Sequence, residues 1–526
     1  MPDPDPRRSR LRALAAVLVA VALAVPAVAS AGSPRPVILV DRDGRATAAS
    51  CDAGPGGSAT RNIGKAVRDA APGTTILVCP GRYRPFAVAG KRDLTIRGVV
   101  PWRAVIRHGG RATPGGDPDL AGIAIAGSRQ IVLQWLTVRH QAPLAGPAGT
   151  AVGCRPLLAG ILVVASRSVE IRGNRVRSVG PGSLDGPCPM SVGIMVGDAT
   201  PLLAGAPAAL AALGDPVDPA TSALIASNRV RGHAFLGIAA TSSLWSGGAG
   251  TGSPVSGPTR ARIVGNSIFF RHPPDACTTS GPTVAPAVRS LLLPARGLAR
   301  LVAAASGVLH PSGRSLCVAE AAGIYQGVPV PDSPIPGASG RIARNRVFSS
   351  APCVLRCRPA GAVQVAAILV ADPAHRPGAS RVTGNLLFRN LIGIALADAA
   401  GAVVAGNRAT EGLIGITVGD TVGATLRANT ATGNRAGIVI TNAPVGTTGA
   451  AGAASPAPWQ VTAELRITGN DARGNVDRSC EDETVGGGSR GTANRWWGNA
   501  GERGSSTPGG LCGAPGSPPP VPAPAP

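Results

Sequence analysis

One phrase recurs at a fixed step in this chain: Gly393-Ile394-Ala395-Leu396, Gly415-Ile416-Thr417-Val418 and Gly437-Ile438-Val439-Ile440. Each copy begins 22 residues after the one before it. Three asparagines keep the same step: Asn385, Asn407 and Asn429. A fixed period of about 20–50 residues marks a repeat architecture, in which each repeat forms one structural unit. The phrase therefore decides the fold class before any other feature does.

Further copies precede these three. The Gly-Ile pair opens apolar, alternating segments at Gly122, Gly160, Gly193, Gly237 and Gly323. Ala367-Ile368 is a degenerate copy. Asparagine-centred turns accompany the copies at Asn174, Asn228, Asn266, Asn345, Asn385, Asn407, Asn429 and Asn470. Alternation of apolar and polar residues, as in residues 424–429, is typical of strands, and no helical period appears in the repeats.

A repeat of this length with short strands predicts one coil of a parallel β-helix. Successive coils would stack about 4.8 Å apart, with their Ile and Val side chains inside. The asparagines would stack in a ladder, each amide bonded to the next coil. An alternative is that they only tolerate left-handed turn conformations. Both interpretations are structural.

The domain organisation follows from this pattern. We expect a β-helix over residues 36–512 and a disordered, Pro-rich tail over 513–526. Ser58 to Ala71 predicts a capping helix with Ile63, Ala66, Val67 and Ala70 on one face, and residues 494–499 with Cys512 predict a closing cap. Loop and helix insertions are expected at 200–222, with a short helix over 204–213, and at 246–262, 272–340 and 443–458. Such insertions either gather on a binding face or decorate the surface.

The N-terminus predicts export. Four arginines precede a 13-residue apolar run from Ala13 to Val25, and Ala27-Val28-Ala29 and Ala29-Ser30-Ala31 both fit a cleavage site. This is the pattern of a signal peptide over residues 1–31, and the run is short of the roughly 20 residues that a membrane span needs. No other stretch is long and apolar enough to span a membrane, so we expect a secreted, extracellular monomer.

Ten cysteines agree with an oxidising compartment. Pairing between sequential neighbours is the favoured arrangement, which gives 51/79, 154/188, 277/317, 353/357 and 480/512. The alternative for Cys353 and Cys357 is metal binding, but no partner pair or nearby His accompanies them.

The formal net charge is +23, and it falls to +21 once residues 1–31 are removed. Nearly all of the positive charge is Arg, since Lys65 and Lys91 are the only lysines. A surface of this kind favours polyanions by electrostatic attraction. A biased composition, rich in Arg, Ala, Gly and Pro together, explains the same charge without a partner.

The first coil carries a resemblance to a known family. The run from Ile63 through Pro80-Gly81-Arg82-Tyr83 to Leu94-Thr95-Ile96-Arg97-Gly98 resembles the first coil of secreted right-handed parallel β-helix repeat proteins, the pectin-lyase-like superfamily. The Gly-Ile-x-Val and Gly-Asn phrases resemble the short repeats of that superfamily, over roughly residues 36–512. The resemblance implies a fold. It implies no single function, because this scaffold hosts lyases, hydrolases, epimerases, adhesins and binding proteins.

The catalytic signatures of that superfamily are missing from the sequence. The Asn-Thr-Asp, Asp-Asp and Gly-His-Gly segments of polygalacturonases do not occur, and neither does the Asp-Pro-His-Asp segment of mannuronan epimerases. Asp372-Pro373-Ala374-His375 comes nearest to the latter but lacks its spacing. No Asp-His pair of the pectate lyase type exists in the chain.

One candidate site is a column of carboxylates that follow the repeat strand. Its members are Asp198, Asp398 and Asp420, with Asp372 in the degenerate copy. Stacking would place those of adjacent coils about 5 Å apart, where they could bind a cation such as calcium or hydrolyse a glycosidic bond. Turn formation is the alternative, and Ser166, Ser242 and Asn442 at similar positions favour it. No other cofactor is expected.

A second candidate site is a column of arginines that follow the ladder asparagines. Its members are Arg175, Arg229, Arg346, Arg408 and Arg435, with Arg177 and Arg231 beside them. Stacked guanidinium groups could bind uronates or sulfates through paired hydrogen bonds. The alternative is a set of solvated turns in an arginine-rich protein.

Three functional hypotheses follow. The first is a non-catalytic module that binds acidic polysaccharide or cell-envelope material through Arg175, Arg229, Arg408, Arg435, Asp398 and Asp420. The second is a polysaccharide lyase or glycoside hydrolase with an atypical active site, and the third is a purely structural surface protein. Binding of nucleic acid is disfavoured, because no recognised module accompanies the basic charge.

Overall fold

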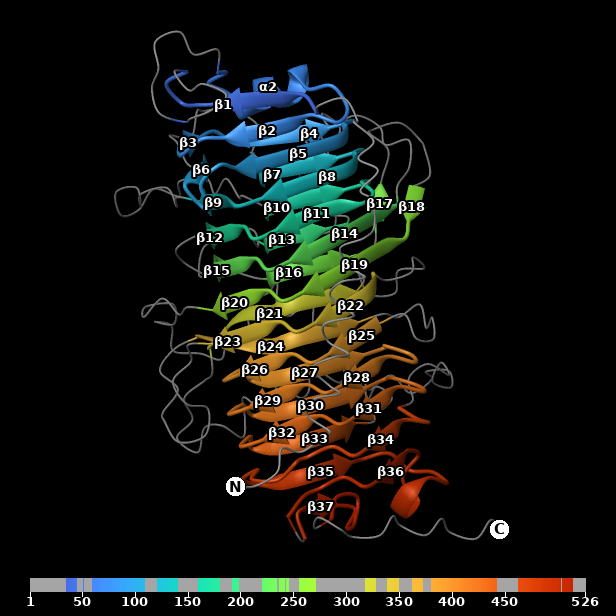
Figure 1. Cartoon of the computed structure of the whole chain (residues 1–526). Helices are drawn as coiled ribbons and strands as arrows, with labels where there is room; N and C mark the ends of the chain where they lie inside the picture. Colours follow the sequence, from blue (N-terminus) through green and yellow to red (C-terminus); the bar gives the residue numbers. More distant parts are fainter. Residues whose placement is uncertain are drawn as a thin grey trace, which may run out of the picture. The chain divides into compact units, whose positions relative to one another are not determined.

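The structure is a computed structural model that describes residues 35–44, 51, 59–108, 121–140, 159–179, 192–197, 220–233, 236–241, 243–245, 255–270, 317–327, 338–349, 362–371, 380–441, 462–502 and 504–513. Every described strand lies within one compact unit, Val37–Pro526. Three long sheets, in which all paired strands are parallel, build this unit (Figure 1).

Sheet A has 13 strands: β1 Val37–Val40, β2 Thr75–Val78, β5 Arg92–Gly98, β8 Arg129–Gln134, β11 Val169–Arg172, β14 Thr221–Ala226, β19 Thr259–Val264, β22 Ser339–Ala343, β25 Ser380–Thr383, β28 Val403–Ala405, β31 Thr425–Arg427, β34 Arg466–Thr468 and β36 Arg495–Trp497. Sheet B has ten: β3 Gly81–Tyr83, β6 Ala104–His108, β9 Leu136–His140, β12 Arg175–Val179, β15 Arg229–His233, β20 Ser267–Phe270, β23 Arg346–Ser349, β26 Leu386–Phe388, β29 Arg408–Thr410 and β32 Thr430–Thr432. Sheet C has 12: β4 Phe86–Ala89, β7 Ala121–Ala126, β10 Ala159–Val164, β13 Val192–Val196, β16 Leu236–Thr241, β21 Cys317–Gly327, β24 Ala362–Ala371, β27 Ile392–Ala397, β30 Ile414–Gly419, β33 Ala436–Thr441, β35 Arg478–Asp482 and β37 Ser506–Thr507.

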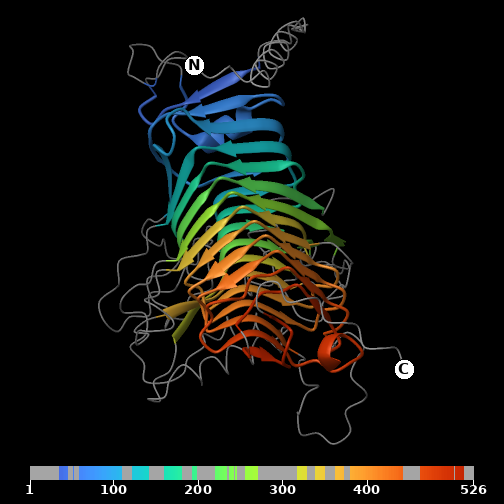
Figure 2. The same cartoon turned by 60° about the horizontal axis from the view of Figure 1, so that its bottom comes forward.

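In most coils the chain passes through sheet A, then sheet B, then sheet C before it starts the next coil. Figure 2 shows these coils stacked along one axis. Residues 22 apart lie side by side in adjacent coils, as in the register Ile394–Ile416–Ile438 of sheet C. The predicted parallel β-helix is confirmed.

The core is a set of inward columns, one from each sheet. Ile394, Ile416 and Ile438 are fully buried. The corresponding column of sheet B includes Val176 and Val230, which are also fully buried. Because side chains alternate along a strand, the residues on either side of these positions point outward. The register of the core thereby fixes which residues form the outer surface.

The asparagine ladder is confirmed, and Asn499 extends it to nine residues. From Asn228 onward, each Asn Oδ1 accepts the side-chain Nδ2 of the asparagine one coil earlier at 2.8–3.2 Å. The same oxygen accepts the backbone N–H of that residue, as from Asn385 to Asn407 at 3.0 Å. The ladder lies at the bend between sheets A and B, so it holds the edge between these two sheets in register.

The glycine of the repeated phrase is required by close packing. A Cβ on Gly393 would lie 2.4 Å from the carbonyl oxygen of Gly415 and 2.5 Å from the Cβ of Ala409. Gly415 meets the same obstacle one coil later, with Ala431 and Gly437 as its neighbours. The recurrence of Gly at the start of the sheet C strand therefore reports the tight approach of successive coils.

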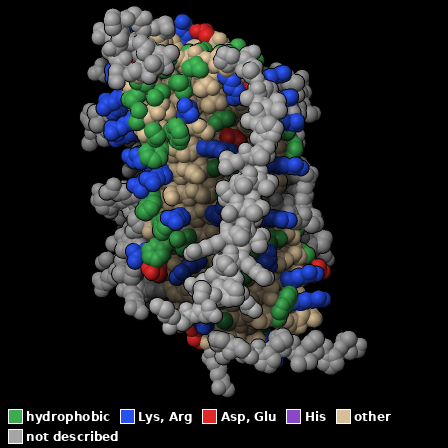
Figure 3. Space-filling model, viewed as in Figure 1, with side chains coloured by type: hydrophobic (Ala, Val, Ile, Leu, Met, Phe, Trp, Pro, Cys, Tyr) green, Lys and Arg blue, Asp and Glu red, His purple; other side chains and the backbone are tan. Residues whose placement is uncertain are grey.

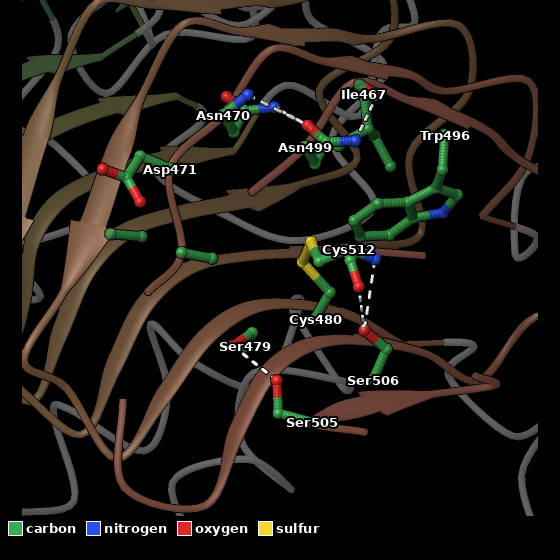
Figure 4. The surroundings of a disulfide bond; sticks show 12 residues. Ile467, Asn470, Asp471, Ser479, Cys480, Trp496, Asn499, Ser505, Ser506 and Cys512 are labelled. Carbon is green, nitrogen blue, oxygen red and sulfur yellow. Dashed lines mark hydrogen bonds between the residues drawn. A yellow bond between two sulfur atoms is a disulfide. The ribbon is translucent and has the colours of Figure 1, made fainter. Parts of the chain in front are cut away.

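Both ends carry caps. Helix α2, Ile63–Asp69, is shorter than the predicted 58–71, and it buries Ile63, Ala66 and Val67 against the first coils. The Oδ1 of Asn62 caps it by accepting the N–H of Lys65 at 3.1 Å. At the C-terminal end Trp496 is 1% exposed, and its Nε1 donates to Asp482 at 2.7 Å. Figure 4 shows this cap beside the last asparagines of the ladder and the disulfide Cys480–Cys512.

Two of the expected disulfides, Cys51–Cys79 and Cys480–Cys512, are confirmed. The other three pairings involve residues outside the described part of the chain. Four other predicted features also lie outside the described residues: the signal segment 1–31, the short helix at 204–213, the tail beyond 513 and the insertion 443–458. Among the helices that the structure describes, none has the length and apolar character to cross a membrane.

Strands of the β-helix lie within three of the ranges that the sequence predicted as insertions. β14 begins at Thr221 inside the predicted 200–222, β19 begins at Thr259 inside 246–262, and β21 spans Cys317–Gly327 inside 272–340. An antiparallel pair, β17 Ser243–Trp245 and β18 Val255–Gly257, projects from the connection before β19. One short 3-10 helix, η3 Ser489–Gly491, lies in the C-terminal cap.

Candidate functional site

The outer face of sheet B carries a column of arginines. Arg177 on β12 lies in register with Arg139 on β9 and with Arg231 on β15. The residues that precede them, including Val176 and Val230, point into the core. The three arginines therefore point outward and are exposed, one per coil at a spacing of about 4.8 Å.

Two further arginines lie beside this column. Arg175 and Arg229 are in register two residues earlier on β12 and β15. Trp102, from the preceding part of the helix, packs against both: the guanidinium carbons lie 3.7 Å and 5.6 Å from its ring centre. Trp102 is itself fixed, because its Nε1 donates to the carbonyl of Gly173 at 2.5 Å. We call Arg139, Arg175, Arg177, Arg229 and Arg231 the sheet B arginine surface.

Among the described residues, no carboxylate pairs with the sheet B arginine surface. None of its five members forms a salt bridge within the described part of the chain. Burial lowers the pKa of Arg175, and the charges of Arg177, Arg229 and Arg231 lower it further. The Nε of Arg175 is buried and has no hydrogen-bond partner. Repulsion among like charges and an unsatisfied donor would both be relieved by a bound anion.

The same column changes character beyond Arg231. Phe269, Phe348 and Phe388 occupy its next three positions on β20, β23 and β26. Phe269 and Phe348 stack with ring centres 5.3 Å apart, and Arg231 lies 4.9 Å from the ring centre of Phe269. Lys and Arg side chains mix with hydrophobic ones along the left side of Figure 3, where Figure 1 places β9, β12 and β15.

The predicted arginine column is brought together only in part. Arg175 and Arg229 are neighbours, and Arg346 and Arg408 occupy the same column farther along the helix. Ser267 separates Arg229 from Arg346, and Leu386 separates Arg346 from Arg408.

Arg435 does not belong to this column, contrary to expectation. It lies between β32 and β33, at the bend from sheet B to sheet C. The asparagine before it, Asn434, is part of a second, shorter ladder: it accepts from Gly412 N at 2.9 Å and donates its own N–H to Asn475 at 2.8 Å. Arg435 forms a salt bridge with Asp477. Thr430 stands where the arginine column would continue.

Asp398 and Asp420 are neighbours in the turn from sheet C to sheet A. Both have left-handed backbone conformations, with φ of 52° and 48°. Asp420 is only 7% exposed. In the coil that contains β10 the equivalent residue is Ala165 and not Ser166. Ser166 and Thr421 share the next position, and each donates its hydroxyl to the carbonyl two residues before it. Asp198, Asp372, Ser242 and Asn442 lie outside the described residues.

One outward column of sheet C is mostly apolar. Leu162, Met195, Leu369 and Ala395 share one outward column and are at most 1% exposed. From β7 to β33, the described residues of this column include no carboxylate and no His. In the described part of the chain no three His, Cys, Asp or Glu side chains are grouped so that they could hold a metal ion.

Reasoning from the sequence missed Arg139 and the role of Trp102. The predicted arginines were those that follow an asparagine of the ladder. In this coil Leu136 occupies the ladder position, and its backbone N–H donates to Asn174 Oδ1 at 2.9 Å. Arg139 lies three residues after Leu136, as Arg177 lies three residues after Asn174. A search by coil position, with any residue allowed at the ladder site, would have found it.

The parallel sheets, the inward columns and the asparagine ladder define a right-handed parallel β-helix repeat protein with the pectin-lyase-like fold. Residues 365–449, well short of half the chain, match the family model described as periplasmic copper-binding protein (NosD). No curated protein matches the chain.

Among solved structures, the Dettilon tailspike protein is 12% identical with a TM-score of 0.45, and the match covers 85% of this chain and 62% of the tailspike. Pectin methylesterase from carrot is 11% identical with a TM-score of 0.34, covering 78% of this chain and 79% of that one. The periplasmic alginate epimerase AlgG is 12% identical with a TM-score of 0.34, covering 77% and 73%. The chain is similar to these proteins in fold alone.

Proposed function

We propose that this protein is an exported, non-catalytic module that binds acidic polysaccharide through the sheet B arginine surface. The observation that carries the proposal is the group of five in-register arginines without carboxylate partners among the described residues. Guanidinium groups bind carboxylates and sulfates through paired, charge-assisted hydrogen bonds. A linear polymer that lies along the β-helix axis would meet at least one of these arginines on each of three consecutive coils.

Export is part of the proposal. The N-terminal signal pattern and the two disulfides, Cys51–Cys79 and Cys480–Cys512, support it, because disulfides persist in oxidising compartments. An acidic polysaccharide outside the cytoplasm is a polyanion that such a protein can meet.

Binding is favoured over catalysis by the placement of the described carboxylates. Asp398 and Asp420 occupy left-handed turn positions, and Asp420 is nearly buried. An enzyme of the lyase or hydrolase type needs acid and base groups that converge on one substrate. From β7 to β33 the described residues of the outward column of sheet C include no carboxylate and no His, so catalysis is not proposed.

The described residues do not fit a copper site either. The stretch that matches the periplasmic copper-binding family contains no His, Cys or Met among its described residues, 365–371 and 380–441. These are the side chains that copper prefers. No step of the proposed function involves a metal.

The test is binding of the mature protein to immobilised polygalacturonate and to neutral dextran. The sheet B triple variant, Arg139→Gln with Arg177→Gln and Arg231→Gln, should lower affinity for polygalacturonate at least about tenfold, the effect of losing one charge-assisted contact or more. The matched control, Arg427→Gln with Arg466→Gln and Arg495→Gln, removes three arginines of sheet A that are also exposed and should change affinity less than about threefold.

Two outcomes would reject the proposal. One is wild-type protein that binds dextran as well as polygalacturonate, or neither. The other is an equal loss in the two triple variants, because net charge alone would then explain binding. Unchanged chain length of polygalacturonate after long incubation should accompany binding, and appearance of unsaturated products would instead establish a lyase.

A further inference from the structure

A second column of arginines lies on sheet A. Arg341 on β22 is in register with Arg262 on β19 and with Arg381 on β25. All three are exposed, and the residues that follow them, Ile263, Ile342 and Val382, are at most 1% exposed. We call Arg262, Arg341 and Arg381 the sheet A arginine column. Like the sheet B arginine surface, it has no salt bridge within the described part of the chain.

The two arginine groups follow one another along the helix axis. The sheet B arginine surface ends on the coil that contains β14 and β15, with Arg229 and Arg231. The sheet A arginine column begins one coil later, with Arg262 on β19. Sheets A and B share the edge held by the asparagine ladder. Exposed arginines therefore occur on every coil as one moves from Arg231 on sheet B to Arg262 on sheet A.

Two more arginines lie on this shared edge. Arg344 has a left-handed backbone, with φ of 54°, in the turn between β22 and β23, and Arg346 begins β23. Both are exposed. Asn345 of the ladder lies between them and is fully buried. Together with Arg341 they carry positive charge around the bend on a single coil.

Three phenylalanines follow Arg231 in the outward column of sheet B, where a polymer that continued straight along this sheet would lie. Straight continuation of the sheet B column would place an anionic polymer on Phe269, Phe348 and Phe388, which offer no charge. Phe269 is 36% exposed, so this part of the face is apolar at the surface. Beyond Arg231, sheet B offers Arg346 and Arg408 only singly, separated by the uncharged Ser267 and Leu386. Sheet A offers Arg262, Arg341 and Arg381 on consecutive coils, so an anionic chain keeps more ion pairs by turning across the edge toward sheet A.

We infer that one acidic polysaccharide chain binds a bipartite track, which runs along the sheet B arginine surface, crosses the edge between Arg231 and Arg262, and continues on the sheet A arginine column, with Arg344 and Arg346 on the shared edge beside it. This inference rests on the proposed function and adds the ligand's path and minimum length. The track covers six coils, from β9 to β25, or about 24 Å along the axis. A short oligosaccharide reaches only one half, whereas a long chain joins both halves and gains from their high effective concentration.

The experiment compares trigalacturonate with long polygalacturonate by titration calorimetry on the full mature protein. Wild type should bind the long polymer at least about tenfold more tightly per chain than trigalacturonate, at one chain per protein on that track. The sheet A triple variant, Arg262→Gln with Arg341→Gln and Arg381→Gln, should lower affinity for the long polymer about tenfold. Its affinity for trigalacturonate on sheet B should stay within about threefold of wild type. The control is again Arg427→Gln with Arg466→Gln and Arg495→Gln.

The results separate this inference from the function on which it rests. If the sheet B triple variant weakens binding but the sheet A triple variant does not, the bipartite track is wrong and the proposed function stands. A second outcome is that wild type has two binding events whose affinity does not depend on the length of the polymer, and that each triple variant removes one of them. Two separate sites would then exist, and the single-chain track would also be wrong. If the sheet B triple variant has no effect, both proposals fail. Unfolding curves that match wild type show that each variant is folded.

Discussion

The side chain of Asn407 satisfies two backbone groups of the preceding coil at once. Its Oδ1 accepts from Asn385 N at 3.0 Å, and its Nδ2 donates to the carbonyl of Val382 at 2.9 Å. Because Asn407 is only 2% exposed, Asn407→Ala would leave both groups buried without partners. We expect the free energy of unfolding to fall by about 3 kcal/mol, measured with chemical denaturant. Arg408→Ala, the exposed neighbour, should change it by less than about 0.5 kcal/mol, and an equal loss in both variants would contradict a specific role for the ladder.

Tyr83 gives a second prediction for a single residue, on alkaline stability. Burial, and next the charge of Asp41, raise the pKa of its phenol above the usual range. The hydroxyl donates to the carbonyl of Cys79 at 2.8 Å. Since the folded pKa exceeds the unfolded value of about 10, stability is unaffected below that pH and decreases above it.

The measurement is an alkaline titration followed by tyrosinate absorbance and by circular dichroism, in a chain with only two tyrosines. The Tyr83 signal should appear together with loss of structure, and Tyr83→Phe should remove that signal and weaken the decline in stability above pH of about 10. Ionisation of Tyr83 in fully folded protein would show that the phenol is not held in its buried, neutral form.

The residues of the candidate site were harder to predict than those of the core. Nearly every ladder asparagine could be found from the sequence, because each one performs the same task in every coil. Arg435 was grouped with Arg408 because both follow an asparagine, yet Asn434 belongs to the second ladder and Asn407 to the first. A dipeptide carries no information about which bend of the coil it occupies, and only the register of the strands supplies it.

At the scale of the element, the entry into each sheet C strand depends on glycine. A Cβ on Gly415 would lie 2.6 Å from the Cβ of Ala431 and 2.7 Å from the carbonyl oxygen of Gly437. We expect Gly415→Ala to lower the free energy of unfolding by about 1–3 kcal/mol, the usual cost of overpacking. Gly487→Ala is the control, because a Cβ there meets nothing within 4 Å. Equal stability of the two variants would show that the coils can separate enough to admit a methyl group.

The strands that keep the 22-residue step were predictable, and those flanked by long connections were predictable only in part. β27, β30 and β33 repeat without interruption, so their phrase stands out. β21 follows a long connection and is 11 residues long, which hid its start inside a predicted insertion. The periodic signal measures the length of a whole coil, so any insertion in a coil removes the signal even where the strands persist.

At the scale of the whole molecule, charge is arranged differently along the helix axis. The sheet B arginine surface and the sheet A arginine column, on β9 to β25, face outward without described carboxylate partners, whereas ion pairs are frequent near the C-terminal end, as in Arg473–Asp471 and Arg478–Glu481. An arginine-rich composition alone would not explain this difference. The β-helix makes this difference possible, because residues at equivalent positions of successive coils lie in line along the same face.

Because equivalent positions of successive coils lie in line, we expect that one complete coil can be removed without loss of the fold. Deletion of residues 386–407 takes out 22 residues and joins Asn385 to Arg408, so that Asn385 would stack directly on Asn429. Each sheet loses one strand, and β25, β23 and β24 would pair with β31, β29 and β30. Because a solenoid is stabilised by nearest-neighbour contacts, we expect a folded protein with strand-rich circular dichroism and cooperative unfolding.

Deletion of residues 386–396, half a coil, is the matched control. It would shift every following strand to the wrong face of the helix, so loss of cooperative unfolding is expected. The whole-coil variant keeps every arginine of the sheet B arginine surface and of the sheet A arginine column. It should therefore bind long polygalacturonate within about threefold of wild type. If it unfolds as readily as the half-coil variant, the coils are not equivalent units, and the ladder is specific to its own sequence of neighbours.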